Sequence, residues 1–189
     1  MKKIFIVNVG SESKKYALYQ DSERVFYAHF EKENGKIIVE LTGANSEKKE
    51  ITLQEFENSA GYIVNELLSR KLIGDKNEIS TIGFRIVAPG NYFLQNKVID
   101  SEYLGKLETA KKQAPLHISP MLVELKALEQ VLPGISVIGI SDSMFHGSLP
   151  ARARFYAIPK NTAEELNIFR FGYHGISFES VIGKLKNIY

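Results

Sequence analysis

The first part of the chain, up to Thr42, is a series of short strand-like runs joined by tight turns. Alternating apolar and polar residues predict strands over residues 3–8 and 15–20, and again in "RVFYAHFEK" and "KIIVELT". Asn34 and Gly35 separate the last two runs, and this pair favours the positive backbone angles of a two-residue hairpin. Strands joined this closely pair antiparallel, because a parallel connection needs a long crossover. The chain therefore begins with an antiparallel sheet.

Helices and strands alternate after this sheet. Residues 53–72 repeat apolar side chains at helical spacing, and Thr52 and Glu55 form a capping-box pattern at their start. A strand is then predicted in "EISTIGFRIV", helices in "SEYLGKLETAKKQ" and "PMLVELKALEQVL", a buried strand in "ISVIGIS", and a final helix in "HGISFESVIGKLKNIY". The sequence thus predicts an α/β fold, with a mixed sheet that opens with antiparallel hairpins and is flanked by helices, in a single domain over residues 1–189.

The composition indicates a globular protein of one ordinary domain. A chain of 189 residues and 21.3 kDa with 44% hydrophobic residues has enough apolar side chains to form a core that needs no stabilising cross-links. The net charge of +2 favours no polyanion, and the absence of Cys excludes disulfides, thiolate catalysis and Cys-based zinc sites. The apolar run after Lys3 is too short for a signal peptide or a membrane span. We expect a cytoplasmic protein with no nucleic acid and no membrane among its partners.

The first turn, "NVGSESKK", has two possible functions. Backbone N–H groups around Gly10, the hydroxyls of Ser11 and Ser13 and the charge of Lys15 suit a concave anion site. The alternative is an exposed hairpin tip that carries polar residues. The turn is not a Walker loop, because the G-K-[ST] ending is missing and a strand follows it.

Two charged residues follow buried strands. Arg85 lies at the end of its strand, where open α/β sheets collect ligand groups, and the alternative is a structural guanidinium paired with a carboxylate. Asp142 directly follows "ISVIGIS". It is either a functional carboxylate or the cap of a short helix over "SMFHG".

Two histidines are further candidates. Gly172 and Gly175 flank His174, and glycines allow the backbone to approach a ligand closely. His117, in "APLHISP", lies in a loop between two prolines. The alternative for each histidine is a structural side chain.

Five segments, in order, resemble the acetate kinase (acetokinase) family of the sugar kinase, heat-shock protein 70 and actin superfamily. The turn "VNVGSESKK" is similar to that family's N-x-G-S-S-S-x-K, and "GFRIVAPG" to its G-H-R-V-V-H-G-G. "APLHISP", "GISDSMFHGSLP" and "FRFGYHGIS" resemble its A-P-L-H-N-P, F-D-T-A-F-H-x-x-M-P and R-R-Y-G-F-H-G-T-S. The resemblance implies a ribonuclease-H-like domain and reversible transfer of the ATP γ-phosphoryl group to acetate, giving acetyl phosphate and ADP.

The resemblance also implies roles for individual residues. Arg85 and His174 would stabilise the transferring phosphoryl group, and His117 would assist binding of the transition state. Asp142 would act near Arg85 and the carboxylate, and Asn8 would help to hold Mg²⁺ and phosphate. The implied phosphate- or nucleotide-binding residues are Asn8, Gly10, Ser11, Ser13 and Lys15, and the implied methyl pocket is Val87, Leu116 and Tyr173.

The resemblance implies partners that lie outside this chain. They are ATP with Mg²⁺, acetate or another short-chain carboxylate, and a second, C-terminal, nucleotide-binding domain. The chain is expected to be inactive alone, because half of the active site is missing, and a homodimer is a further possibility. The positions that depart from the family pattern are Glu12, Phe84, Ala88, Pro89 and Tyr173. The alternatives are a degenerate, non-catalytic binding module and a propionate kinase.

Overall fold

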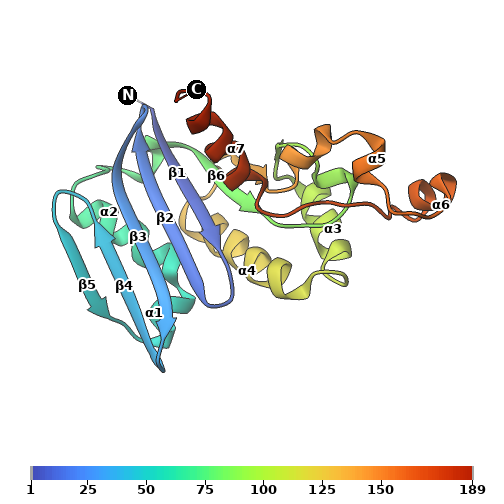
Figure 1. Ribbon diagram of the computed structural model, residues 1–189. Coiled ribbons are helices and arrows are strands. Elements are labelled where there is room, and N and C mark those ends of the chain that lie inside the picture. Colours follow the sequence, from blue (N-terminus) through green and yellow to red (C-terminus); the bar gives the residue numbers. More distant parts are fainter. Residues whose placement is uncertain (1, 189) are drawn as a thin grey trace. The chain divides into compact units, whose positions relative to one another are not determined.

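The chain folds into two compact units. The computed structural model describes residues 2–188 (Figure 1). Unit 1 comprises Met1–Arg85 and Ser119–Ile138, and unit 2 comprises Ile86–Ile118 and Gly139–Tyr189.

Five consecutive strands come first, and helices and strands then alternate as the sequence predicts. The strand order is β5-β4-β3-β2-β1-β6-β8-β7. The pairs from β1 to β5 are antiparallel, whereas β1 and β6 pair parallel. The predicted mixed α/β fold is confirmed. The strands are β1 (Lys3–Val9), β2 (Ser13–Gln20), β3 (Glu23–Glu33), β4 (Lys36–Thr42), β5 (Ser46–Glu50), β6 (Ile79–Ile86), β7 (Lys97–Val98) and β8 (Val137–Ser141).

The core of unit 1 lies on the sheet face that helices cover (Figure 1). These helices are α1 (Leu53–Glu57), α2 (Ser59–Ser69) and the part of α4 (Pro115–Val131) from Ser119 onward. Phe5 stacks on Tyr16 at 5.8 Å, and Phe30 makes edge contacts with Tyr16 and Tyr62, both at 5.7 Å. Every second residue of a strand points toward these helices, and the aromatic side chains at such positions form the core.

The helix predicted over residues 53–72 is interrupted at Asn58, which separates α1 from α2. A Cβ built at Gly61 would lie 2.7 Å from Asn58 Oδ1, so the Asn58 side chain folds back over the start of α2. The backbone of Asn58, with φ −94° and ψ 33°, departs from the helical conformation, and this departure separates the two helices. The predicted capping box of Thr52 and Glu55 is present at the start of α1.

Unit 2 contains mostly short helices. Its core includes Phe93 and Tyr103, whose rings lie 5.4 Å apart, and Gly139 leaves room for the Tyr103 ring. Burial raises the pKa of the Tyr103 hydroxyl above its usual value. The remaining helices, with the 3-10 turns, are η1 (Lys76–Glu78, in unit 1), η2 (Asn91–Phe93), α3 (Ser101–Ala110), η3 (Met144–Ser148), α5 (Ala151–Arg154), α6 (Lys160–Glu165) and α7 (Gly175–Leu185).

The prediction that His117 lies in a loop is wrong. The helix predicted from Pro120 begins at Pro115, so His117 lies in its first turn and Pro120 lies within it. Pro115 suits the first helical position, because its missing N–H would have no partner there.

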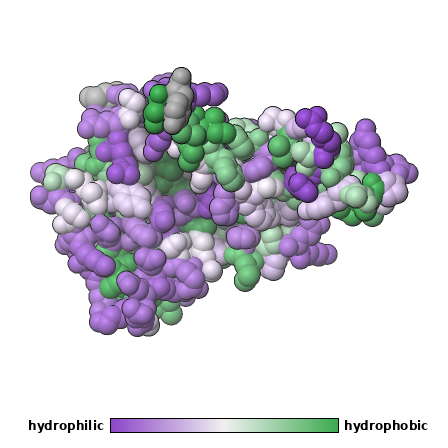
Figure 2. All heavy atoms as spheres, viewed as in Figure 1, coloured by the Kyte–Doolittle hydropathy of each residue, from purple (hydrophilic) through white to green (hydrophobic). Residues whose placement is uncertain are grey.

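Helix α7 exposes an apolar face. Figure 2 shows hydrophobic side chains over this helix. No helix within residues 2–188 has both the length and the apolar composition that crossing a membrane requires. The exposed apolar residues of α7 are Phe178, Val181, Ile182 and Leu185.

Candidate functional site

Three of the predicted site residues lie side by side on one face of the unit 1 sheet. Asn8 on β1 is directly opposite Lys15 on β2, so the two side chains share a face. Val7 pairs with Phe84 on β6, which places Arg85 next to Asn8. The Arg85 guanidinium donates a hydrogen bond from Nη1 to Asn8 Oδ1 at 3.1 Å. We call Asn8, Lys15 and Arg85 the polar row; it combines two cations with an amide and is suited to an anion.

The β1–β2 turn, residues 10–12, lies at the end of the polar row. It is closed by a hydrogen bond from Gly10 N to Ser13 O at 2.8 Å. Ser11 and Glu12 are exposed, and the Glu12 carbonyl accepts a hydrogen bond from Lys32 N at 3.0 Å. The turn is thus accessible to a ligand, and it presents the Glu12 carboxylate where the family pattern has a serine.

In unit 2, Asp142 holds the backbone around His174. The Asp142 carboxylate is 1% exposed and accepts hydrogen bonds from His174 N at 2.8 Å and Ile176 N at 3.2 Å. Its own carbonyl accepts from Gly175 N at 2.9 Å, so closely that a Cβ at Gly175 would lie 2.2 Å from this oxygen. Asp142 therefore caps α7, and the predicted cap of the "SMFHG" segment is wrong.

His174 itself has a left-handed backbone, with φ 69°, and it is exposed. Gly172 precedes it, also with positive φ, at 58°. Such a conformation is uncommon for a residue with a side chain and needs support from its surroundings. The Asp142 carboxylate supplies that support and so fixes the direction in which the His174 imidazole leaves the backbone.

His117 and Tyr173 contact each other within unit 2. Their rings lie 5.6 Å apart in an edge arrangement, and burial raises the pKa of the Tyr173 hydroxyl. Of the other residues predicted for the methyl pocket, Val87 is 6% exposed and Leu116 is 78% exposed. Val87 and Tyr173 thus offer apolar surface that is at least partly buried, whereas Leu116 does not.

The predicted residues form two sets in different units. The polar row belongs to unit 1, whereas His117, Asp142 and His174 belong to unit 2. Their convergence on one phosphoryl group stays a prediction.

A metal ion would find few protein ligands in the polar row. Within residues 2–188 no group of three or more His, Asp or Glu side chains is placed to hold one. Asn8 Oδ1 accepts a hydrogen bond from Arg85 and retains a second lone pair. This donor set fits Mg²⁺ that arrives with phosphate and water ligands, since Mg²⁺ keeps several waters and needs few protein oxygens.

Three of the departures from the family pattern are buried. Phe84 is 0% exposed and points away from Arg85, since neighbouring strand residues face opposite sides. Ala88 is 1% exposed, and Pro89 is also buried. These three replacements therefore add apolar surface to the interior.

Two features of unit 1 are not predicted from the sequence. His29 lies opposite Lys15 across β2 and β3, on the face of the polar row. Lys14, next to Lys15, points to the other face and forms a buried ion pair with Glu124 at 2.9 Å. Alternation with the inward Tyr16 and Leu18 was the signal that could have placed Lys14 in the interior.

Comparisons of the sequence agree with the resemblance noted above. The sequence model of the Acetokinase family matches residues 3–189. The acetate kinase of Thermotoga maritima is 32% identical over 98% of this chain and 48% of its own length. That of Mycoplasma capricolum subsp. capricolum is 30% identical, also over 98% of this chain and 48% of its own length. The chain thus spans about half the length of the curated relatives it matches.

Comparisons of the structure agree as well. A propionate kinase from Francisella tularensis superposes with a TM-score of 0.87 at 25% identity, covering 100% of this chain and 49% of that chain. The acetate kinase of Porphyromonas gingivalis superposes with a TM-score of 0.83 at 28% identity, covering 100% of this chain and 49% of that chain. The actin-like fold implied by the resemblance is confirmed.

Proposed function

Because the chain belongs to the acetokinase family, we propose that it forms the phosphoryl-binding half of an acetate kinase. The reaction is reversible transfer of the ATP γ-phosphoryl group to acetate, which gives acetyl phosphate and ADP. The observation that carries this proposal is the polar row, in which Arg85, Asn8 and Lys15 adjoin on one sheet face.

The chemistry of the reaction suits these side chains. A loose phosphoryl-transfer transition state spreads negative charge over three oxygens, so it needs fixed cationic donors more than covalent catalysis. Arg85 is the donor for these oxygens, and its hydrogen bond to Asn8 orients it. Lys15 supplies a second positive charge next to Asn8.

A general base is not needed, because acetate is ionised near neutral pH. Asp142, whose carboxylate accepts two backbone N–H groups, is therefore assigned a positioning role toward His174. His174 stabilises the transferring group, and His117 contacts Tyr173 beside the acyl pocket. Asn8 would hold Mg²⁺ that arrives with the nucleotide, and the metal would neutralise charge on the phosphate oxygens.

A titration of the chain with inorganic phosphate tests the role of the polar row. We expect perturbed amide signals at Gly10 and Ser11, and Arg85→Ala weakens binding roughly 10- to 100-fold, as for a lost hydrogen bond between charged groups. Arg85→Lys keeps the charge and loses less. Arg24→Ala, an exposed arginine on β3 of the same sheet, is the matched control and binds as the parent does. Equal affinities of Arg85→Ala and Arg24→Ala would remove the basis of the proposal.

A second candidate is a non-catalytic acetokinase-like binding module. It is favoured by the exposed Glu12 carboxylate at the turn, which repels polyphosphate. The Glu12→Ser variant separates the two candidates. If phosphate binds away from Glu12, as an acetate kinase half requires, its affinity changes little; if Glu12 blocks the site, as in a degenerate module, the affinity rises by about tenfold or more when the repulsive charge is removed.

The acyl specificity within the kinase proposal is acetate, with propionate as the alternative. The structural similarity to a propionate kinase supports this alternative. Comparing acetate and propionate as acceptors in a catalytically active, C-terminally extended form distinguishes them.

A further inference from the structure

We propose that the buried pair Lys14–Glu124 is a positioning device for the β1–β2 turn. It fixes the turn against the helices of unit 1 and directs Lys15 to the polar row. The part of this inference that concerns phosphate rests on the proposed function, whereas the part that concerns the geometry of the turn does not.

The Lys14 ammonium is bound by groups from three helices. Its Nζ donates to Phe56 O at the end of α1 at 2.9 Å, to Ser59 Oγ on α2 at 2.7 Å and to Glu124 Oε2 on α4 at 2.9 Å. The Tyr16 hydroxyl donates to Glu124 Oε1 at 2.6 Å and lies 2.8 Å from Ser59 Oγ. Burial and the Glu124 charge raise the pKa of Tyr16 well above its usual value. Every partner of the ammonium is thus supplied by the protein interior.

This polar cluster is almost fully buried. Lys14 is 7% exposed, Tyr16 is 1% exposed, and Ser59 and Glu124 are 0% exposed. Removing two charges from water carries a desolvation penalty that their attraction often fails to offset, so a buried ion pair adds little to stability. Its best-attested use is to specify one geometry over others. The question is therefore which geometry this pair specifies.

The turn lacks close packing on its inner side. A cavity of about 440 Å³ is lined by Gly10 and Ser11 of the turn and, among the helix residues, by Phe56, Ser119 and Pro120. A Cβ built at Gly10 would meet Ser13 O at 3.6 Å and no other atom outside its neighbours within 4 Å. Lys14 is the first inward side chain after the turn, and it also lines this cavity. Its hydrogen bonds to the helices therefore take the place of packing beneath the turn.

The pair also selects between two adjacent lysines. Lys14 and Lys15 face opposite sides of β2, and a register slip of one residue would exchange them. Glu124 is matched by the inward Lys14, which pairs across the ladder with Val9. Lys15 then faces outward, opposite Asn8. The buried carboxylate thus acts with the inward Tyr16 and Leu18 to keep Lys14 inside and Lys15 in the polar row.

Amide hydrogen exchange in the free protein tests the positioning role. The double variant Lys14→Met/Glu124→Met replaces the pair with apolar side chains of similar size, so we expect the melting temperature to be largely kept. We expect the Gly10 amide, which donates to Ser13 O, to exchange at least about tenfold faster, while the Ala28 amide in the middle of β3 is unchanged. Unchanged Gly10 exchange in a stable double variant would overturn the proposal.

The matched control is an exposed pair on the same sheet. Lys36 and Glu50 lie 2.7 Å apart with side chains 62% and 57% exposed, and Lys36→Met/Glu50→Met leaves Gly10 exchange as in the parent. If the buried double variant does not fold, Lys14→Met/Glu124→Gln gives the same readout, because it removes both charges and keeps an acceptor for the Tyr16 hydroxyl. Faster Gly10 exchange with unchanged Ala28 exchange supports the proposal, and equal exchange at Gly10 overturns it.

A phosphate titration separates this inference from the proposed function. We expect the double variant to bind phosphate about tenfold more weakly than the parent although Arg85 is intact. If Gly10 exchange rises but the parent protein does not bind phosphate, the positioning role stands and the proposed function fails. If the parent binds phosphate through Arg85 and the double variant matches it in both affinity and exchange, the positioning role fails and the proposed function stands.

Discussion

Asp142 is a residue whose contacts determine its role. The resemblance implies an action near Arg85 and the substrate carboxylate, and both carboxylate oxygens of Asp142 accept hydrogen bonds from the backbone at the start of α7. A buried carboxylate that accepts backbone N–H groups forms charge-assisted hydrogen bonds, which are stronger than neutral ones. Asp142 thereby stabilises the left-handed His174 and the tight approach at Gly175.

The first prediction at this scale concerns Asp142→Ala. We expect it to destabilise the protein by about 1–3 kcal/mol, because buried N–H groups lose their acceptor. Asp142→Asn retains an oxygen acceptor and loses less. Urea unfolding measures both effects. Glu179→Ala, which removes an exposed carboxylate from α7 itself, is the control and changes stability by at most about 0.5 kcal/mol. Equal losses for Asp142→Ala and Glu179→Ala would contradict the capping role.

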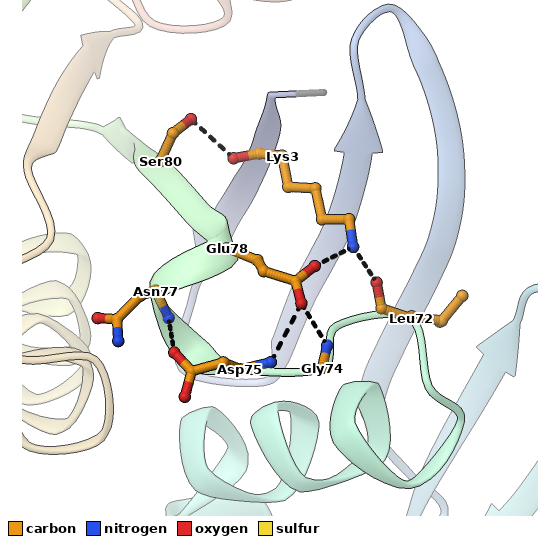
Figure 3. A network of polar contacts seen from close by, with 7 residues as sticks. All are labelled: Lys3, Leu72, Gly74, Asp75, Asn77, Glu78 and Ser80. Atoms are coloured by element: carbon orange, nitrogen blue, oxygen red, sulfur yellow. Dashed lines mark hydrogen bonds and ion pairs between the residues drawn. The ribbon is translucent and has the colours of Figure 1, made fainter.

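At the scale of elements, the polar row depends on the pairing of β1 with β6. Figure 3 shows the contacts where these strands begin. Glu78 accepts hydrogen bonds from Gly74 N at 2.7 Å and Asp75 N at 3.2 Å, and it forms an ion pair with Lys3. The Lys3 carbonyl accepts a hydrogen bond from Ser80 Oγ at 2.9 Å. This network fixes the start of the parallel pair whose far end holds Asn8 beside Arg85.

The pH dependence of stability tests this network. The Lys3 ammonium, followed by the Gly74 amide, lowers the pKa of Glu78 below its usual value. A carboxyl group whose pKa is lowered in the folded state contributes stability above its unfolded pKa and loses that contribution as the pH falls through the folded pKa. We expect Glu78→Gln to lower the melting temperature at about pH 7, and we expect this difference from the parent to shrink as the pH falls through the folded-state pKa of Glu78.

Thermal unfolding followed by circular dichroism makes this comparison. Glu129→Gln, at an exposed position on α4, serves as the control at each pH value. A difference between Glu78→Gln and the parent that stays constant as the pH is lowered from about 7 until the carboxyl group of the folded protein is protonated would show that the charge of Glu78 is not responsible.

At the scale of the whole molecule, the chain carries one part of the proposed reaction. It spans 48% of the Thermotoga maritima acetate kinase, which it matches at 32% identity. The adenosine-binding part and further catalytic groups are proposed to come from a second domain. Phosphoryl transfer depends almost entirely on positioning and electrostatic stabilisation, so a half-site gives little rate enhancement.

A hydroxamate assay for acetyl phosphate tests this proposal. We expect no product above background from the 189-residue chain with acetate, ATP and Mg²⁺. We expect turnover when the chain is extended at its C-terminus with the second half of the Thermotoga maritima relative. Arg85→Ala in the extended form lowers the rate about 100- to 1000-fold. An extended form that folds, binds ATP and stays inert with acetate and propionate would favour the non-catalytic binding module.

Local signals predicted much of the fold. Asn34 and Gly35 have positive φ, as their hairpin prediction requires, and the capping box of Thr52 and Glu55 is present. The prediction of one continuous helix over residues 53–72 is wrong. Asn58 interrupts a helix that apolar periodicity predicts as continuous, since its backbone, with φ −94° and ψ 33°, leaves the regular helical conformation.

The sequence identified candidate site residues but did not predict how they are arranged in space. Asn8, Lys15 and Arg85 were named from one turn and one strand end, and the strand register brings them together. The two prolines around His117 predict a loop, although Pro115 starts a helix. The meeting of Arg85 with Asp142 and His174 remains a prediction.

The sequence by itself determined the order of strands and helices, the family and the residue types available for phosphate, because alternation, turn residues and motifs are local patterns. The tertiary structure alone decided that the inward Lys14 pairs with Glu124, 110 positions away, and that Asp142 caps α7. The physical reason is that a buried charge takes the partner that the packing of distant elements supplies. No local pattern along the chain specifies that partner.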